Sequence, residues 1–412
     1  MKKGWTVYSM EEVKKHNCKA DLWLVIDGGV YDCTRWLPRH PGGVVLLQFA
    51  GRDASDTFAA LHEPSVYNWL KPFQIGVAEQ GMPIPDDLKE FRKLRTQLWA
   101  AGWFKARSDG LLRTMALITS IGTCCLWTTI FCSSVSAHLL GACLLGLFWK
   151  QCLLFAHDCC HRCATRNKLA DKLLGPCFGT LLGGIGSGWW NWEHSMHHAV
   201  TQVVDADPSA GYPPVFCTDR LQVKLNDWST RLQLKVQSLL YVPICVFLGR
   251  YNLHFLSLVS CPPAERPRDC ILMACYASYV WYLLTFLPTW ERLPYYFVAN
   301  SVTGVLHLIL NMNHYSMPMQ ASMDSADKMG FFRFQLTGTS NISTNPFLQW
   351  YYGGLEHQVE HHLFPLMPRY NLPGVQKLVK EIALKHDVPY NTAGFFSRNW
   401  DVVQTLHAVK LE

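Results

Sequence analysis

The stretch His194-Ser195-Met196-His197-His198 places three imidazoles within five residues of a 412-residue chain that carries 17 histidines. Spacings of three and four residues put side chains on one face of a helix. Two other stretches have similar spacing: His157-Asp158-Cys159-Cys160-His161 and Gln358-Val359-Glu360-His361-His362. One such group alone is equally consistent with hydrogen-bonded structural histidines. Three groups in one chain indicate a metal centre.

Apolar stretches of nearly bilayer length surround these groups. About four of them are long enough to cross a membrane as helices, at 111–135, 136–156, 270–288 and 294–312. Two more, 176–190 and 236–259, are glycine-rich or interrupted by polar residues, and we expect interfacial or re-entrant helices there. Lys and Arg are scarce in the turns between paired spans and frequent outside them. The positive-inside rule therefore predicts that all three histidine groups and the N-terminal domain are cytosolic.

The composition excludes several classes of protein. Hydrophobic residues make up 49% of the chain and charged residues only 17%, which is incompatible with a disordered chain. A net charge of +6 spread over this length does not indicate a nucleic-acid partner. Many of the 16 cysteines lie in apolar runs and the chain opens without an apolar signal segment, so we expect no disulfide framework.

Residues 1–80 predict a small soluble α+β domain. Residues 23–31 form a hairpin pattern with a glycine turn, and 44–49 and 54–61 are helical runs. His40, in His40-Pro41-Gly42-Gly43, and His62 could hold an iron porphyrin from its two faces. Residues 81–110 predict a linker and a basic helical approach to the membrane, and 111–412 form an all-α integral membrane domain.

The first domain resembles cytochrome b5. The resemblance rests on His40-Pro41-Gly42-Gly43, on 23–25, 31–32 and 49–54, and on Phe58 before His62, and it covers residues 5–79. It implies that His40 and His62 are the axial ligands of a haem b. Because both axial positions are then filled, such a haem transfers electrons and does not bind oxygen.

The remaining histidine groups offer more ligands than one zinc ion uses. A catalytic zinc takes about three protein ligands, whereas seven His and one Gln converge here, enough for two ions. Imidazole suits iron, and open coordination positions suit oxygen activation. A haem that delivers single electrons also favours a redox metal over zinc.

With its fused haem domain, the chain resembles, over nearly its whole length, the front-end branch of the membrane fatty acid desaturases. Two marks carry the resemblance: the fused cytochrome b5 domain, and Gln358 in place of the first His of the third group. The flanks Gly353-Gly354-Leu355 and Leu363-Phe364-Pro365 are also similar. The resemblance implies a di-iron centre whose ligands are His157, His161, His194, His197, His198, Gln358, His361 and His362. His314, near the end of the last span, resembles a further ligand of the wider family.

The resemblance also implies an activity. It implies insertion of a cis double bond between an existing double bond and the carboxyl end of a fatty acyl chain, with O2 as co-substrate. A separate NADH–cytochrome b5 reductase would supply the electrons, the substrate would be an acyl-CoA or an acyl lipid, and the location would be the endoplasmic reticulum membrane. Regioselectivity, chain length and oligomeric state do not follow from the sequence.

Several neighbouring residues have two interpretations. Asp158, Glu360, Asp205 and Asp207 are candidates to hold the far ring nitrogen of a ligand His, and solvation in a loop is the alternative for Asp205 and Asp207. His307, an ionisable group within a span, is either functional or a hydrogen-bonded core histidine, and we expect the core role. We expect His357 to be a hydrogen-bonding neighbour of the ligands. The run 189–192, Trp-Trp-Asn-Trp, fits either an acyl channel or an interfacial aromatic belt.

Three other functions compete. A sphingolipid long-chain-base desaturase shares the haem domain and the Gln358 group, so the motifs do not separate it. A fused lipid hydroxylase uses a different histidine pattern. A membrane-anchored haem carrier would not need intact histidine groups.

Overall fold

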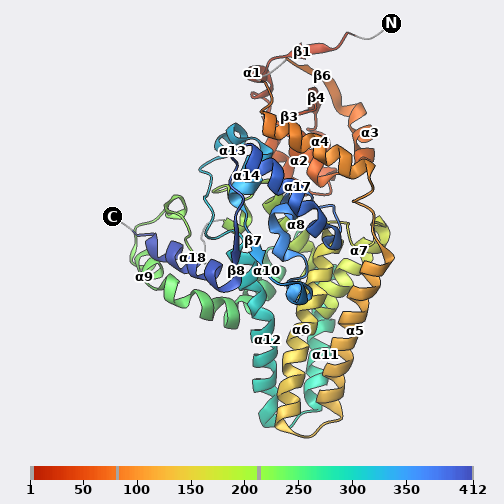
Figure 1. The fold of residues 1–412 in the computed structure, drawn as a ribbon, viewed down its shortest axis with the longest axis vertical. Helices are drawn as coiled ribbons and strands as arrows, with labels where there is room; N and C mark the ends of the chain where they lie inside the picture. The colour runs from red at the N-terminus through yellow and green to blue at the C-terminus, as the bar shows by residue number, and fades with distance from the viewer. Residues whose placement is uncertain (1–3, 80–82, 211–214, 411–412) are drawn as a thin grey trace.

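The protein is described by a computed structural model covering residues 4–79, 83–210 and 215–410. Residues 80–82, where the predicted linker begins, lie outside this range. Figure 1 shows an elongated molecule with the N-terminal domain at one end and long helices at the other. The C-terminal segments lie between them, which places the three histidine groups in the middle of the molecule.

The N-terminal domain is built on a small sheet of strand order β1-β6-β4-β3-β2, with β5 paired to β3. The predicted hairpin is β3–β4, and its turn residues Asp27 and Gly28 both have positive φ, at 47° and 77°. The run expected at 44–49 is a 3-10 helix, η2, rather than an α-helix, in keeping with its short length and its two adjacent β-branched valines. The strands are β1 Thr6–Tyr8, β2 Asn17–Cys18, β3 Asp21–Ile26, β4 Gly29–Asp32, β5 Arg52–Asp53 and β6 Gln74–Ala78, and the helices are α1 Met10–Val13, η1 Leu37–Arg39, η2 Gly43–Phe49, α2 Ser55–Leu61, η3 Pro64–Val66, α3 Tyr67–Leu70 and η4 Lys71–Phe73.

Four long helices run side by side away from this domain: α5 Ser108–Ile130, α6 Val135–Cys160, α11 Arg266–Thr285 and α12 Thr289–Met312 (Figure 1). Four helical segments among the described residues are long and apolar enough to cross a membrane, and α5, α6 and α12 are three of them. The fourth is Trp228–Val259, which we expected to be interfacial over 236–259. The helix α11, at 20 residues, is long enough, but its apolar content is lower because it begins with Arg266, Arg268 and Asp269.

The segment Trp228–Val259 is not one straight helix. It consists of α9 Trp228–Pro243, a π-helical turn η8 Ile244–Leu248, and α10 Gly249–Val259. The turn follows Pro243, which cannot donate a backbone hydrogen bond. Figure 1 shows α9 lying across the direction of the long helices, beside α18 Phe395–Ala408.

The remaining elements cap the long helices. The predicted basic approach helix is α4 Asp86–Ala100, whose Leu88, Phe91, Leu94 and Leu98 pack against C-terminal residues such as Phe332 and Val375. The other cap elements are α7 Lys168–Pro176, η5 Cys177–Leu182, α8 Ser187–Ala199, η6 Pro208–Ala210, η7 Arg220–Gln222, α13 Met323–Met329, α14 Phe331–Gly338, β7 Asn341–Ser343, η9 Pro346–Leu348, α15 Gln349–Tyr352, η10 Leu355–His357, α16 Gln358–Leu363, η11 Arg369–Asn371, α17 Leu372–Lys385 and β8 Thr392–Gly394. The strands β7 and β8 pair in parallel and join the segment before α16 to the end of the chain.

Candidate metal centre and haem site

Helix ends bring the three histidine groups together. His157 lies in the last turn of α6 and His161 is its C-cap, while α8 carries the second group and α16 the third. His314 follows the end of α12. All nine predicted ligands are buried. They form two groups that adjoin each other.

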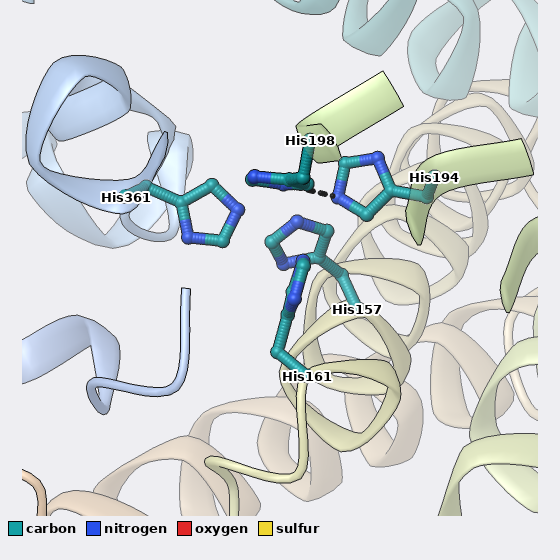
Figure 2. A group of neighbouring side chains, drawn as sticks. All are labelled: His157, His161, His194, His198 and His361. Atoms are coloured by element: carbon teal, nitrogen blue, oxygen red, sulfur yellow. Dashed lines mark hydrogen bonds between the residues drawn. The ribbon is translucent and has the colours of Figure 1, made fainter. Parts of the chain in front are cut away.

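Five histidines form the first group: His157, His161, His194, His198 and His361. Figure 2 shows their rings pointing toward one another from three helices. One ring nitrogen of each lies within 4.8 Å of those of the others. The Nε2 atoms of His194 and His198 are 3.2 Å apart, the separation expected of two nitrogens about 2.1 Å from one ion at roughly a right angle. The Nε2 atoms of His157, His161 and His361 have no hydrogen-bond partner among the described residues, so they are free to bind an ion.

The second group consists of His197, His314 and His362, with Gln358 beside them. The Nε2 atoms of His197 and His314 are 3.4 Å apart, and the side-chain amide nitrogen of Gln358 is 3.3 Å from His314 Nε2. The amide oxygen of Gln358 has no partner among the described residues, and rotation of the amide would exchange the two atoms. This group therefore offers three imidazoles and an amide oxygen to a second ion.

Burial keeps most of these imidazoles neutral, as metal binding requires. It lowers the pKa of His314 to about 3 and holds the pKa values of His194, His198, His361 and His362 well below the ordinary value. The neighbouring rings strengthen the effect, because two imidazolium charges so close together repel. Neutral imidazole nitrogens that are buried without a hydrogen-bond partner can donate their lone pairs to a divalent metal ion.

The second nitrogens of several rings are fixed by hydrogen bonds. His197 Nδ1 lies 2.9 Å from the Asp207 carboxylate, and His314 Nδ1 lies 2.9 Å from the carbonyl oxygen of Gly338. His362 Nδ1 lies 3.1 Å from the Gln335 amide oxygen. Burial opposes protonation of His197, but the charge of Asp207 outweighs it and raises the His197 pKa. Gln335 has no sequence signal, because nothing in its local pattern separates it from any other helical glutamine.

The acidic candidates behave differently from one another. Asp207 is buried against His197, whereas Asp205 is exposed and pairs with Lys224. An oxygen of Asp158 is 3.6 Å from His157 Nδ1, and its other oxygen accepts a bond from Arg369. The expectation for Glu360 is wrong: its carboxylate accepts hydrogen bonds from Asn341 and Tyr390 and faces away from the rings. Helical spacing explains this, because Glu360 lies on the opposite side of α16 from the metal-facing rings.

Two further histidines lie outside the two groups. His307 packs against Gly249, where an added Cβ would lie 2.8 Å from the ring. His357 is buried beside Glu356, 4.0 Å away, and neither of its ring nitrogens has a hydrogen-bond partner among the described residues. The predicted hydrogen bond from His357 to a ligand is therefore not present.

An apolar cavity reaches the first histidine group. Its wall includes His157 together with leucines of α6, α10 and α12. Trp190 also lines the cavity and stacks on His194, with ring centroids 4.8 Å apart. The cavity lining consists of Leu153, Leu154, Ala156, His157, Gly175, Gly179, Ile185, Ser187, Trp190, Asn191, Leu253, Leu306, Leu310 and Leu355.

The N-terminal domain brings the rings of His40 and His62 close together, with their planes tilted by 45°. Their ring centroids are 6.1 Å apart. Two imidazole nitrogens on opposite sides of one metal lie about 4 Å apart, and the ring centres lie farther out, so this spacing fits an iron between them. His62 Nδ1 lies 3.0 Å from the Phe58 carbonyl oxygen, which leaves Nε2 for a metal. A Cβ at Gly42 would lie 2.8 Å from the His40 ring, so a larger residue there would displace it.

Comparison with known proteins agrees with this arrangement. Residues 134–394 match the sequence model of the family "Fatty acid desaturase", and residues 9–79 match that of "Cytochrome b5-like Heme/Steroid binding domain". Delta(8)-fatty-acid desaturase 2 of Arabidopsis thaliana is 33% identical over 415 residues, covering 96% of this chain and 91% of that protein. Acyl-lipid (9-3)-desaturase of Borago officinalis is 30% identical, covering 98% and 93%, and Delta(6)-fatty-acid desaturase fat-3 of Caenorhabditis elegans is 27% identical, covering 92% and 94%. The chain therefore belongs to the fatty acid desaturase family and carries a cytochrome b5-like domain at its N-terminus.

Proposed function

We propose that the protein is an oxygen-dependent di-iron desaturase of the front-end type. It introduces a cis double bond between an existing double bond and the carboxyl end of an unsaturated fatty acyl chain. The observation that carries the proposal is the convergence of eight histidines and Gln358 into two adjoining groups beside an apolar cavity.

The reaction needs a redox metal and electrons. Removing two hydrogens from adjacent methylenes while O2 becomes two waters requires two electrons and two protons from outside the substrate. Iron held by the two groups would supply oxygen activation. The haem between His40 and His62 would pass single electrons that a separate NADH-dependent reductase delivers.

The chain's own residues position the reaction. His157 and Trp190 form the part of the cavity wall nearest the first group, so an acyl chain in the cavity would pass beside it. The leucines exclude water from that chain, and Asn191 and Ser187 are polar groups in the same wall. The hydrogen bond from His197 to Asp207 holds one ring in a fixed orientation and tautomer.

We also propose the membrane setting. The N-terminal domain and the histidine groups are adjacent, so both lie on one side of the membrane, and the Lys and Arg distribution makes that side cytosolic. The endoplasmic reticulum membrane, where acyl-CoA, acyl lipids and a cytochrome b5 reductase meet, is the proposed location.

The test is expression in a yeast that lacks polyunsaturated lipids. Cells receive single unsaturated fatty acids of different lengths, and mass spectrometry maps new double bonds in fatty acids and in long-chain bases. His361→Ala and His40→Ala are the matched controls for the metal groups and the haem. Both should lose product, while His361→Ala should keep a normal haem spectrum.

The outcomes separate the candidates. A new cis bond on the carboxyl side of a supplied bond supports the proposal and fixes the position. A new bond found only in long-chain bases would assign the enzyme to sphingolipids instead. No new bond in either pool, with the protein present and its haem bound, would refute a desaturase function.

A further inference from the structure

A groove on the outer side of the long helices lies next to the apolar cavity. It runs between α10, α11 and α12, and most of its lining side chains are apolar. On α11 the lining residues recur at helical spacing from Cys270 to Leu284. At 1.5 Å per residue this stretch is about 21 Å long, more than half of the roughly 30 Å hydrocarbon core of a bilayer. The groove is therefore long enough for one acyl chain of a lipid.

A wall about one residue thick separates the groove from the cavity. On α10, Leu253 lines the cavity, and the next residue, His254, lines the groove. Farther along, Ile185 lines the cavity, and its neighbour Gly184 packs against the ring of Tyr276, which lines the groove. A Cβ at Gly184 would lie 2.7 Å from that ring. The two hollows therefore run beside each other.

The first turns of α8 and α11 join the two hollows at one end. The backbone N–H of Gly188 donates a 2.7 Å hydrogen bond to Asp269, the residue before Cys270 of the groove. Arg268 donates a 3.2 Å hydrogen bond to the hydroxyl of Ser187, which lines the cavity. A molecule with two chains can place one chain in each hollow and keep its head group at this end.

A positive charge lies at the same end. Arg266 is four residues before Cys270 and therefore on the same face of α11. Arg266 is exposed, its guanidinium donates to the carbonyl oxygen of Cys261, and no carboxylate pairs with it within the part of the chain that the structure describes. Asn191, one turn after Ser187, is exposed and lines the cavity, so the cavity opens near this end as well. A guanidinium is a good partner for a phosphate group.

We propose that the groove binds the second acyl chain of a diacyl phospholipid whose first chain is the substrate in the cavity. The phosphate of this lipid lies beside Arg266. Two adjoining apolar hollows with a cation where they meet match a phosphate that carries two chains. An acyl-CoA also has phosphates but only one acyl chain, so it would leave the groove to bulk lipid. The inference rests on the proposed function, and it names the carrier of the acyl group.

Helix α11 offers a matched pair of variants. Ala274 and Ala277 are exposed and line the groove, whereas Cys275 and Ser278 are exposed and lie outside it. Ala274→Trp fills the groove, and Cys275→Trp adds the same indole about 100° around the helix. The full chain, loaded with haem and iron, is studied in nanodiscs of saturated phosphatidylcholine, with NADH and cytochrome b5 reductase. Both variants must first show the wild-type haem spectrum and iron content.

The assay presents one unsaturated acyl group on three carriers: phosphatidylcholine, lysophosphatidylcholine and CoA. We expect the wild type to act best on the diacyl lipid. Ala274→Trp should lower kcat/KM for phosphatidylcholine about tenfold, because the indole takes the place of the second chain, and should leave lysophosphatidylcholine unaffected. Cys275→Trp should match the wild type. A preference for acyl-CoA, or equal kcat/KM for phosphatidylcholine in both tryptophan variants, would overturn the inference.

Crosslinking provides a readout that does not depend on activity. A phosphatidylcholine with one unsaturated chain and a diazirine on the other is irradiated in the nanodiscs, and mass spectrometry locates the label. A lipid bound in the groove labels Ala274 and Ala277 in preference to Cys275 and Ser278, and excess unlabelled lipid of the same kind removes the label. Equal labelling of both stripes would refute the inference even if the enzyme is active. Groove labelling without product from any carrier would refute the desaturase function and leave the lipid site standing.

Discussion

The ion pairs of Asp56 offer the sharpest test of how the haem domain is held. Asp56 is buried, and its carboxylate accepts bonds of 2.9 and 2.7 Å from Arg92 and lies 3.4 Å from Arg95. The side chains of Asp56, Arg92 and Arg95 are 10%, 28% and 13% exposed. Removing one partner costs about 3–5 kcal/mol when a pair is fully buried and about 0.2–1 kcal/mol when it is exposed. For this partly buried group we expect roughly 2 kcal/mol, or about a 25-fold change in the unfolding equilibrium of the haem domain.

The assay is urea unfolding of the haem domain in the full chain, followed by haem absorbance. A double-mutant cycle of Asp56→Ala, Arg92→Ala and the double variant isolates the pair from other effects of each change. Lys89→Ala is the control, because it breaks an exposed pair with Asp86 on the same helix and should leave the unfolding curve unchanged. A coupling energy below about 0.5 kcal/mol would show that this contact does not hold the domain, and the reasoning would fail.

Three further predictions concern the site. Gly179→Val should shift products toward shorter acyl chains in the yeast assay. A Cβ at residue 179 would already lie 3.1 Å from Ala156, and the branched side chain of valine would fill part of the cavity. An unchanged product profile would place the acyl chain elsewhere. Asp207→Asn should weaken iron binding about 10–100-fold, measured by metal analysis after dialysis, because His197 loses its anionic partner; full iron retention would contradict this. Burial lowers the pKa of His62 to about 4. Acidification should therefore leave the haem spectrum intact until the pH approaches that value, where a proton competes with iron for the His62 ring. Loss of haem near pH 6.5 would contradict this prediction.

Local spacing explains which parts of the site could be predicted. The pairs His157/His161 and His194/His198 are four residues apart, and helix geometry alone puts each pair on one side. The hairpin at Asp27-Gly28 also depends only on neighbouring residues, because a two-residue hairpin turn with positive φ favours the pair Asp-Gly. The assembly of three separate groups is not local; the predicted topology puts them on one side of the membrane, and the resemblance to a known family implies that they share one centre.

The errors come from contacts between distant segments. Glu360 sits among ligand residues in sequence, yet Asn341 and Tyr390, from other parts of the chain, hold it on the far side of α16. The segment Trp228–Val259 is long and apolar enough to cross a membrane, although we expected an interfacial helix over 236–259, whereas α11 lies beside the long helices as expected for a span. The basic approach helix α4 has a second role that its charge pattern does not show, because Arg92 and Arg95 pair with Asp56 of the N-terminal domain.

The second histidine group shows how one short sequence can serve two domains. In His194-Ser195-Met196-His197-His198 the histidine positions follow from the need to direct three imidazoles to one side of a helix. That requirement leaves Met196 on the other side, where it is buried in the apolar cluster shared with the haem domain. A charged residue at this position would leave the metal-facing side intact and still disrupt the docking surface, because an unpaired charge in an apolar cluster is costly. The two requirements are met by different residues of the same helical turn, so the metal groups and the haem domain are tied to each other by the same short helix.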